Sequence, residues 1–115
     1  MKNVLVTGAT GNIGRELVQY LTQISNEIQV VAAVRDVKKS KTKLINYEGL
    51  KFVHFDFNKV TTFYPAFEEI DVLFLLRPPQ ISDVDLFFDP LLKAAKVAGI
   101  RKIVFLSVQG VEKSK

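Results

Sequence analysis

The chain has 115 residues, a formal net charge of +4 and no cysteine. This length suits one domain with a sizeable core, and the lack of cysteine excludes disulfides and thiolate metal sites. No window reaches the roughly 18 apolar residues of a transmembrane helix, and the first residues do not form a signal peptide. We therefore expect a cytoplasmic protein with no membrane partner.

The positive charge is concentrated in one segment, DVKKSKTK, and the arginine before it. The basic residues there, offset only by Asp36, are Arg35, Lys38, Lys39, Lys41 and Lys43. A nucleic-acid-binding face usually interleaves such charges with aromatic or polar base-reading residues, which this segment lacks. We interpret it as a solvated helix surface and expect no nucleic-acid partner.

The first half of the chain alternates apolar runs with helical patterns. Residues 3–7, NVLVT, are rich in β-branched and apolar side chains, which predicts a strand that ends at Gly8. Residues 12–24 repeat apolar positions at the helical period. A second strand is predicted over 28–35 and a basic helix from there to about residue 46. Gly49 marks a turn into a third strand over 50–57.

The second half continues the alternation. We predict a short helix around 59–68, a fourth strand over 71–76 and a fifth over 102–108. Ser82 and Asp85 resemble a capping box that opens a helical region ending at Gly99. Pro90 complicates this helix, because an interior proline breaks or kinks it. The alternative is that Asp89 caps a new helix with Pro90 at its first position.

Continuously apolar strands that alternate with helices predict an α/β fold. Such strands are buried on both faces, as in a parallel sheet covered by helices. We therefore expect a three-layer, doubly wound parallel sheet of five strands in a single domain spanning residues 1–115.

The stretch VTGATGNIG places glycines at positions 8, 11 and 14, between the first strand and the first helix. A helix N-terminus offers unpaired N–H groups and the positive end of a dipole, which together favour a phosphate. Gly8 would allow a sharp turn, Gly11 the approach of a pyrophosphate, and Gly14 close packing of the helix on the strand. The pattern therefore predicts dinucleotide binding, with a ligand-free tight turn as the alternative.

The end of the second strand bears on the choice of cofactor. An acidic residue there favours NAD, whereas arginine accommodates the 2′-phosphate of NADP. Arg35 therefore favours NADP, with NAD as the other candidate, since a guanidinium matches a phosphate with two hydrogen bonds. Lys38 and Lys39 could add positive charge near the same phosphate. Alternatively, Arg35 only pairs with Asp36 or caps the sheet edge.

With VTGATGNIG, AAVRD, HFDF and IRKIVFLSVQG in this order, the chain resembles the NmrA-like branch of the atypical short-chain dehydrogenase/reductase superfamily. The resemblance spans essentially the whole chain and implies an NAD(P)-binding Rossmann domain. Family members include NADPH-dependent reductases of quinones, dyes and isoflavone-like substrates, sugar-nucleotide epimerase relatives, and regulators that bind the dinucleotide.

The resemblance implies a role for each matching position. The pyrophosphate would lie on the loop from Gly8 to Gly14, and Arg35 would meet the 2′-phosphate. Asp56 would accept a hydrogen bond from the adenine amino group, beside Phe57. The other implied cofactor contacts are Thr10, Asn12 and Ile13 in the loop, Leu76, Arg77 and Pro78 along the ribose and the middle of the cofactor, and Ser107 near the nicotinamide.

The chain departs from the family in length. Family members are well over twice as long and add a substrate-binding lobe, so we expect a truncated cofactor domain that is inactive alone, with a natural protein that has lost its substrate half as the alternative. The superfamily's Tyr-x-x-x-Lys pair would fall beyond residue 115. Tyr47 and Lys51 match that spacing, but they span the turn before the third strand, and we interpret the match as coincidence. The catalytic residues are thus not identified.

Few other residues point to chemistry. His54, the only histidine, is expected to be a surface or packing residue, and no cluster supports a metal. Ser107 lacks an activating base, so we interpret it as a cofactor contact only. Two groups of aromatic residues are expected to form helix faces beneath a core, with an interaction patch as the alternative: Phe87 and Phe88, and Phe63, Tyr64 and Phe67.

Two hypotheses on function follow. The first is an NADPH-dependent oxidoreductase that transfers hydride to a quinone-, dye- or carbonyl-type small molecule. The second is a non-catalytic regulator that senses NADP(H) and acts through a protein partner. A module for another phosphate-bearing ligand, such as a sugar nucleotide, ranks below both. A homo-oligomer is left open, since a fifth strand at the sheet edge could pair between chains.

Overall fold

A computed structural model of the chain describes residues 2–9, 11–24, 27–43, 49–57, 59–76 and 85–106. The strands are β1 (Lys2–Thr7), β2 (Ile28–Val34), β3 (Lys51–His54), β4 (Val72–Leu76) and β5 (Lys102–Leu106). The helices are α1 (Asn12–Ile24), α2 (Val37–Lys43), α3 (Phe63–Phe67), which follows a 3₁₀ turn at Val60–Thr62, and α4 (Asp85–Ala98).

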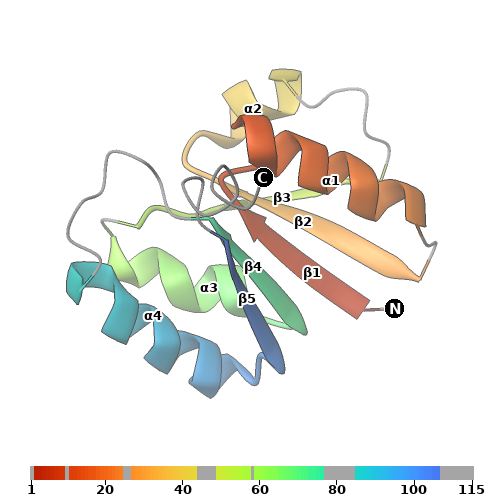
Figure 1. The fold of residues 1–115 in the computed structure, drawn as a ribbon. Coiled ribbons are helices and arrows are strands. Elements are labelled where there is room, and N and C mark those ends of the chain that lie inside the picture. The colour runs from red at the N-terminus through yellow and green to blue at the C-terminus, as the bar shows by residue number, and fades with distance from the viewer. Residues whose placement is uncertain are drawn as a thin grey trace, which may run out of the picture.

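The strands form one parallel five-stranded sheet in the order β3-β2-β1-β4-β5. The chain moves from β1 outward to β2 and β3, and then crosses back to β4 on the other side of β1. The predicted α/β, doubly wound parallel sheet is thus confirmed (Figure 1). The order reverses between β1 and β4, and in such sheets ligands bind beyond the carboxyl ends of the strands at this point.

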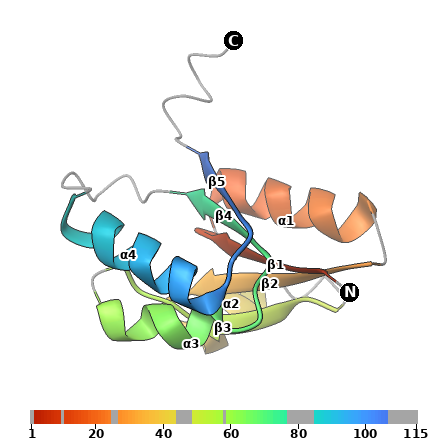
Figure 2. The same ribbon diagram turned by 90° about the horizontal axis from the view of Figure 1, so that it is seen from below.

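The sheet carries a hydrophobic core on each face, because neighbouring residues of a buried strand point to opposite sides. On one face, Val4 and Val6 of β1 pack with Val18 and Leu21 of α1. On the other face, Leu5 packs with residues of β4, α3 and α4. Figures 1 and 2 show the resulting layers, with α1 on one side of the sheet and α3 and α4 on the other.

The second core cluster is rich in aromatic rings. Phe55 stacks on Phe63 and Phe67 at centroid distances of 5.2 and 5.9 Å, and Phe57 meets Phe55 edge-on at 4.9 Å. The expected burial of Phe63 and Phe67 is confirmed, but that of Tyr64 is wrong: its side chain is 49% exposed. In a short helix, only the positions one turn apart face the sheet. The side chains of Phe87 and Phe88 lie outside the described part.

The third strand is shorter than the predicted range 50–57, because its partner ends first. Phe55 still donates its N–H to the carbonyl of Val34 at 2.8 Å, but β2 stops at Val34 and the chain enters α2. The backbone of Asp56 is then bound by a turn, in which its N–H donates to Oγ1 of Thr62 at 3.0 Å. Residues 55–57 therefore form a loop at the end of the strand.

Pro90 lies inside α4, so the alternative of a new helix capped by Asp89 is wrong. A proline in the second turn removes one helical hydrogen bond and strains the turn before it. The helix continues because Leu91, Ala94 and Ala95 bury a continuous face against the sheet. None of the described helices is both long and apolar enough to cross a membrane.

Candidate functional site

The loop after β1 folds tightly onto the start of α1. Gly8 has φ of 64°, a left-handed conformation that side chains disfavour. The N–H of Gly11 donates to the carbonyl of Gly8 at 3.1 Å, and the carbonyl of Gly11 accepts the N–H of Arg15 at 2.9 Å. Gly11 is thus the N-cap of α1. The next amides, of Asn12, Ile13 and Gly14, lie in the first turn, where the helix itself offers no acceptor.

Gly14 is required by the packing of the chain on itself. A Cβ atom at this position would lie 1.9 Å from the carbonyl oxygen of Gly8 and 2.9 Å from Cα of Ala9. The close approach is therefore between the helix and the glycine loop, rather than between the helix and the strand as predicted.

Gly11 differs from Gly14 in this respect. Among the described residues, a Cβ there would meet only the carbonyl oxygen of Gly8, at 3.4 Å. The packing of the described residues thus tolerates a small side chain at position 11, where the glycine is exposed. This is the geometry that a ligand approaching the first turn of α1 would need.

Thr7 joins the two central strands where the sheet order reverses. The last paired residues of β1 and β4 are Val6 and Phe74. Beyond them, the buried hydroxyl of Thr7 accepts the N–H of Leu76 at 2.8 Å and lies 3.2 Å from its carbonyl oxygen, to which it can donate. The side chain of Thr7 thus replaces the missing ladder bond and keeps Leu76 beside Gly8, where a Cβ on the glycine would lie 3.5 Å from Cβ of Leu76.

Arg35 lies at the same edge of the sheet, because the pairing of Thr7 with Ala33 places Gly8 and Arg35 just beyond adjacent strand ends. Its side chain is exposed. The expected alternative, a pair with Asp36, is not found: Oδ1 of Asp36 accepts the N–H of Lys39 at 3.1 Å and caps α2. No ion pair joins Arg35 to any residue that the structure describes.

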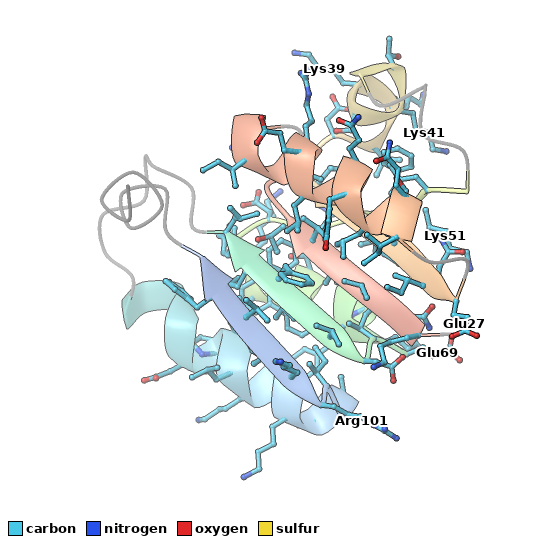
Figure 3. All side chains as sticks on the ribbon, turned by 45° about the vertical axis from the view of Figure 1, so that its right-hand side comes forward. Glu27, Lys39, Lys41, Lys51, Glu69 and Arg101 are labelled. Carbon is cyan, nitrogen blue, oxygen red and sulfur yellow. The ribbon has the colours of Figure 1, made fainter. Side chains whose placement is uncertain are left out.

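The helix that follows Arg35 and Asp36 is basic. Lys38, Lys39 and Lys41 of α2 are all exposed, and Figure 3 shows Lys39 and Lys41 projecting from that helix. His54 is exposed as well, and its Nδ1 lies 3.0 Å from the carbonyl oxygen of Arg35. The expectation of a surface histidine is therefore confirmed, although the ring has a specific backbone partner.

Asp56 and Phe57 follow β3 at this edge, since Val34 pairs with His54. Asp56 is half-buried in a loop whose backbone is held by Thr62. The ring of Phe57 is only 9% exposed and packs in the core against Phe55. If Phe57 adjoins a ligand, it therefore does so mainly through its backbone.

The remaining predicted site residues lie outside the described part of the chain. These are Thr10, Arg77, Pro78 and Ser107, together with the side chain of Asn12. The structure thus brings Gly8, Gly11, Gly14, Arg35 and Asp56 to one edge of the sheet, with Ile13 in the first turn of α1 and Leu76 beside the loop.

This arrangement agrees with the comparisons to known proteins. The profile of the NmrA-like family matches residues 1–115. The chain belongs to the NmrA-like family. It is 32% identical over 111 residues to the prestalk A differentiation protein A of Dictyostelium discoideum, covering 96% of this chain and 36% of that protein.

Two solved structures of other proteins share the fold. The triphenylmethane reductase of Citrobacter sp., complexed with NADP(H), matches with a TM-score of 0.75 at 30% identity. The match covers 89% of this chain and 36% of the reductase. NmrA, a negative transcriptional regulator in complex with NADP, matches with a TM-score of 0.74 at 23% identity. The match covers 90% of this chain and 32% of NmrA. The chain thus spans about a third of the length of these relatives.

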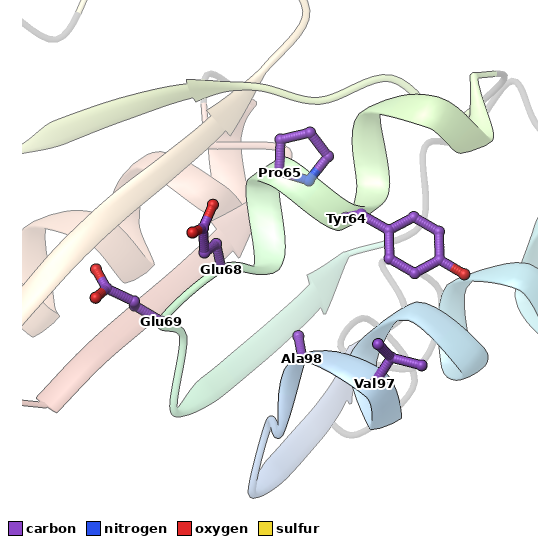
Figure 4. A pocket seen from close by; sticks show the side chains of 6 residues that line it. All are labelled: Tyr64, Pro65, Glu68, Glu69, Val97 and Ala98. Atoms are coloured by element: carbon purple, nitrogen blue, oxygen red, sulfur yellow. The ribbon is translucent and has the colours of Figure 1, made fainter.

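A shallow depression at the other end of this NmrA-like domain lies between α3 and α4 (Figure 4). It has a volume of about 370 Å³ and is lined by Tyr64, Pro65, Glu68, Glu69, Val97 and Ala98. These residues precede β4 and β5, whereas the glycine loop lies beyond the carboxyl ends of the strands. Within the described ranges, no group of acidic or histidine side chains could hold a metal ion.

Proposed function

We propose that this chain is an NADP(H)-binding domain of an NmrA-like reductase that acts on a quinone-, dye- or carbonyl-type small molecule. The observation that carries the proposal is the glycine loop between β1 and α1, next to a basic residue at the end of the adjacent strand β2. The similarity to a triphenylmethane reductase complexed with NADP(H) supports both the cofactor and the reaction class.

The loop fits a diphosphate for a steric reason. Among the described residues, a Cβ at Gly11 would meet no atom closer than 3.4 Å, so position 11 has room on its exposed side. A diphosphate would occupy that room, and a large side chain there would compete with it. The amides of Asn12, Ile13 and Gly14 would donate to the diphosphate, with the dipole of α1 favouring its charge. Thr10 would line the same loop.

The adenosine half of the cofactor would be held along the strand ends. The exposed guanidinium of Arg35 would bind the 2′-phosphate, with Lys38 and Lys39 adding positive charge. Asp56 would accept from the adenine amino group. Leu76, Arg77 and Pro78 would border the ribose, and Ser107 would adjoin the nicotinamide, which supplies the hydride when bound.

Calorimetric titration with NADPH and NADH tests the proposal. We expect both to bind, NADPH the more tightly. Absence of binding of both nucleotides at millimolar concentration would refute it. For the reaction, we expect the full protein to consume NADPH in the presence of quinones or dyes, which absorbance of the reduced nicotinamide reports.

A second function, a sensor of NADP(H) that acts through a protein partner, is favoured by two relatives that are not named as enzymes: the prestalk A differentiation protein and, by fold alone, the regulator NmrA. Both functions require the same cofactor site. Turnover of NADPH by the full protein with any of the tested acceptors would contradict a purely sensory role.

A further inference from the structure

The backbone of Arg35 is bound by a side chain of the neighbouring strand. Val34 and His54 are the last paired residues of β2 and β3. Arg35 follows Val34 directly, and its carbonyl oxygen lies 3.0 Å from Nδ1 of His54. Because a carbonyl can only accept, the imidazole donates from Nδ1. The ring thus continues the contact between the two strands after their backbone ladder has ended.

The chain that follows Arg35 is fixed as well. Asp36 caps α2 through its side chain, and its carbonyl accepts the N–H of Ser40 at 3.0 Å. The peptide that carries Arg35 is therefore restrained by β3 on one side and by α2 on the other. The guanidinium itself is exposed, without an ion pair among the described residues.

Core packing does not account for a histidine at position 54. The residue is exposed, and β3 is an edge strand of the sheet. What the ring adds at this place is a hydrogen-bond donor directed at the backbone of Arg35. A group whose backbone is fixed before a ligand arrives loses less conformational entropy on binding.

We propose that His54 is a positioning residue for Arg35: it holds the backbone from which the guanidinium projects, and so strengthens the discrimination of a phosphorylated adenosine ribose from an unphosphorylated one. The inference rests on the proposed function, since it requires that Arg35 meets the 2′-phosphate. It predicts that His54 acts on the preference between two cofactors, which differ only in that phosphate, rather than on binding of both.

The test measures dissociation constants for NADPH and NADH with the full protein and three variants. His54→Phe keeps a ring but removes the donor, and we expect it to lower the preference for NADPH about 3- to 10-fold, as for the loss of one hydrogen bond. His54→Asn retains a donor near the position of Nδ1 and should keep the preference for NADPH close to that of the parent protein. Lys51→Phe, at the exposed other end of the same strand, is the matched control and should change neither constant.

A double-mutant cycle separates this role from a structural one. In an Arg35→Ala background, His54→Phe should no longer change the preference, because the group that it positions is absent. An unchanged preference in the single variant, or an equal loss for NADPH and NADH, would overturn the inference. If Arg35→Ala itself leaves the preference unchanged, the assignment of the 2′-phosphate to Arg35 fails instead, and this inference fails with it. As a control, thermal unfolding of each variant is compared with that of the parent protein, and we expect each variant to be folded at the temperature of the binding experiment.

Discussion

Gly14→Ala tests the packing of the first helix on the glycine loop. The new Cβ would lie 1.9 Å from the carbonyl oxygen of Gly8 and 2.6 Å from its carbon. Both atoms are backbone, so no side chain can rotate away, and either α1 or the loop must shift by about 1.5 Å to bring the new Cβ to ordinary contact distance. The methyl group therefore acts on the backbone of the binding site itself.

The magnitude follows from two opposing effects. Overpacking of this kind destabilises by about 1–3 kcal/mol, and a clash between backbone atoms should fall at the upper end. Alanine regains up to about 1 kcal/mol in helix propensity over glycine. We expect a net loss of about 2 kcal/mol in the free energy of unfolding, which for a domain of this size lowers Tm by roughly 8 °C.

Gly11→Ala is the matched control in the same loop. Its Cβ would lie 3.4 Å from the same carbonyl oxygen, so the expected loss is at most about 1 kcal/mol, from a poorer N-cap. Denaturant and thermal unfolding followed by circular dichroism measure both variants, and titration with NADPH measures binding. A larger residue at position 11 should abolish binding while the fold persists. If Gly14→Ala unfolds at the temperature of the parent, the steric argument is wrong.

Three further predictions concern single side chains. Arg35→Ala should weaken NADPH binding by about 1–3 kcal/mol and NADH binding less, as calorimetry can measure; an equal loss would show that Arg35 does not select the cofactor. Thr7→Val should lower the stability by about 1–3 kcal/mol in urea unfolding, because the buried N–H of Leu76 loses its acceptor; unchanged stability would contradict the bridging role. Glu69 has φ of 63°, so Glu69→Gly should raise the free energy of unfolding by up to about 1 kcal/mol; a loss of similar size would show that the turn gains more from the glutamate than it loses in strain.

The predictions from sequence succeeded where a local pattern and the tertiary structure require the same residues. Val4, Leu5 and Val6 are apolar in succession because both faces of β1 are covered, and that pattern alone predicts a central parallel strand. The glycine at position 8 likewise predicts the turn after β1, since a left-handed conformation after a strand is rarely adopted by another residue.

Predictions failed where distant packing outweighs a local preference. The alternative of a new helix at Pro90 failed because Pro90 lies inside α4, where Leu91, Ala94 and Ala95 are buried on the sheet, a gain that no local pattern reports. Tyr64 is exposed although both neighbours in the aromatic pattern are buried, because a helix of five residues presents a narrow face. The strand β3 ends early because β2, its partner, turns into a helix.

The fold class, the glycine loop and the basic residue beyond β2 can all be predicted from local sequence, since each depends on properties of neighbouring residues: apolar periodicity, backbone freedom and charge. The hydrogen-bond partners of Thr7 and His54 depend instead on how the strands pair, because Leu76 lies at the end of β4 and Arg35 just beyond the end of β2, both distant in the sequence from the side chains that bind them. A hydroxyl or an imidazole is chemically able to make many contacts, and the register of the strands selects one of them.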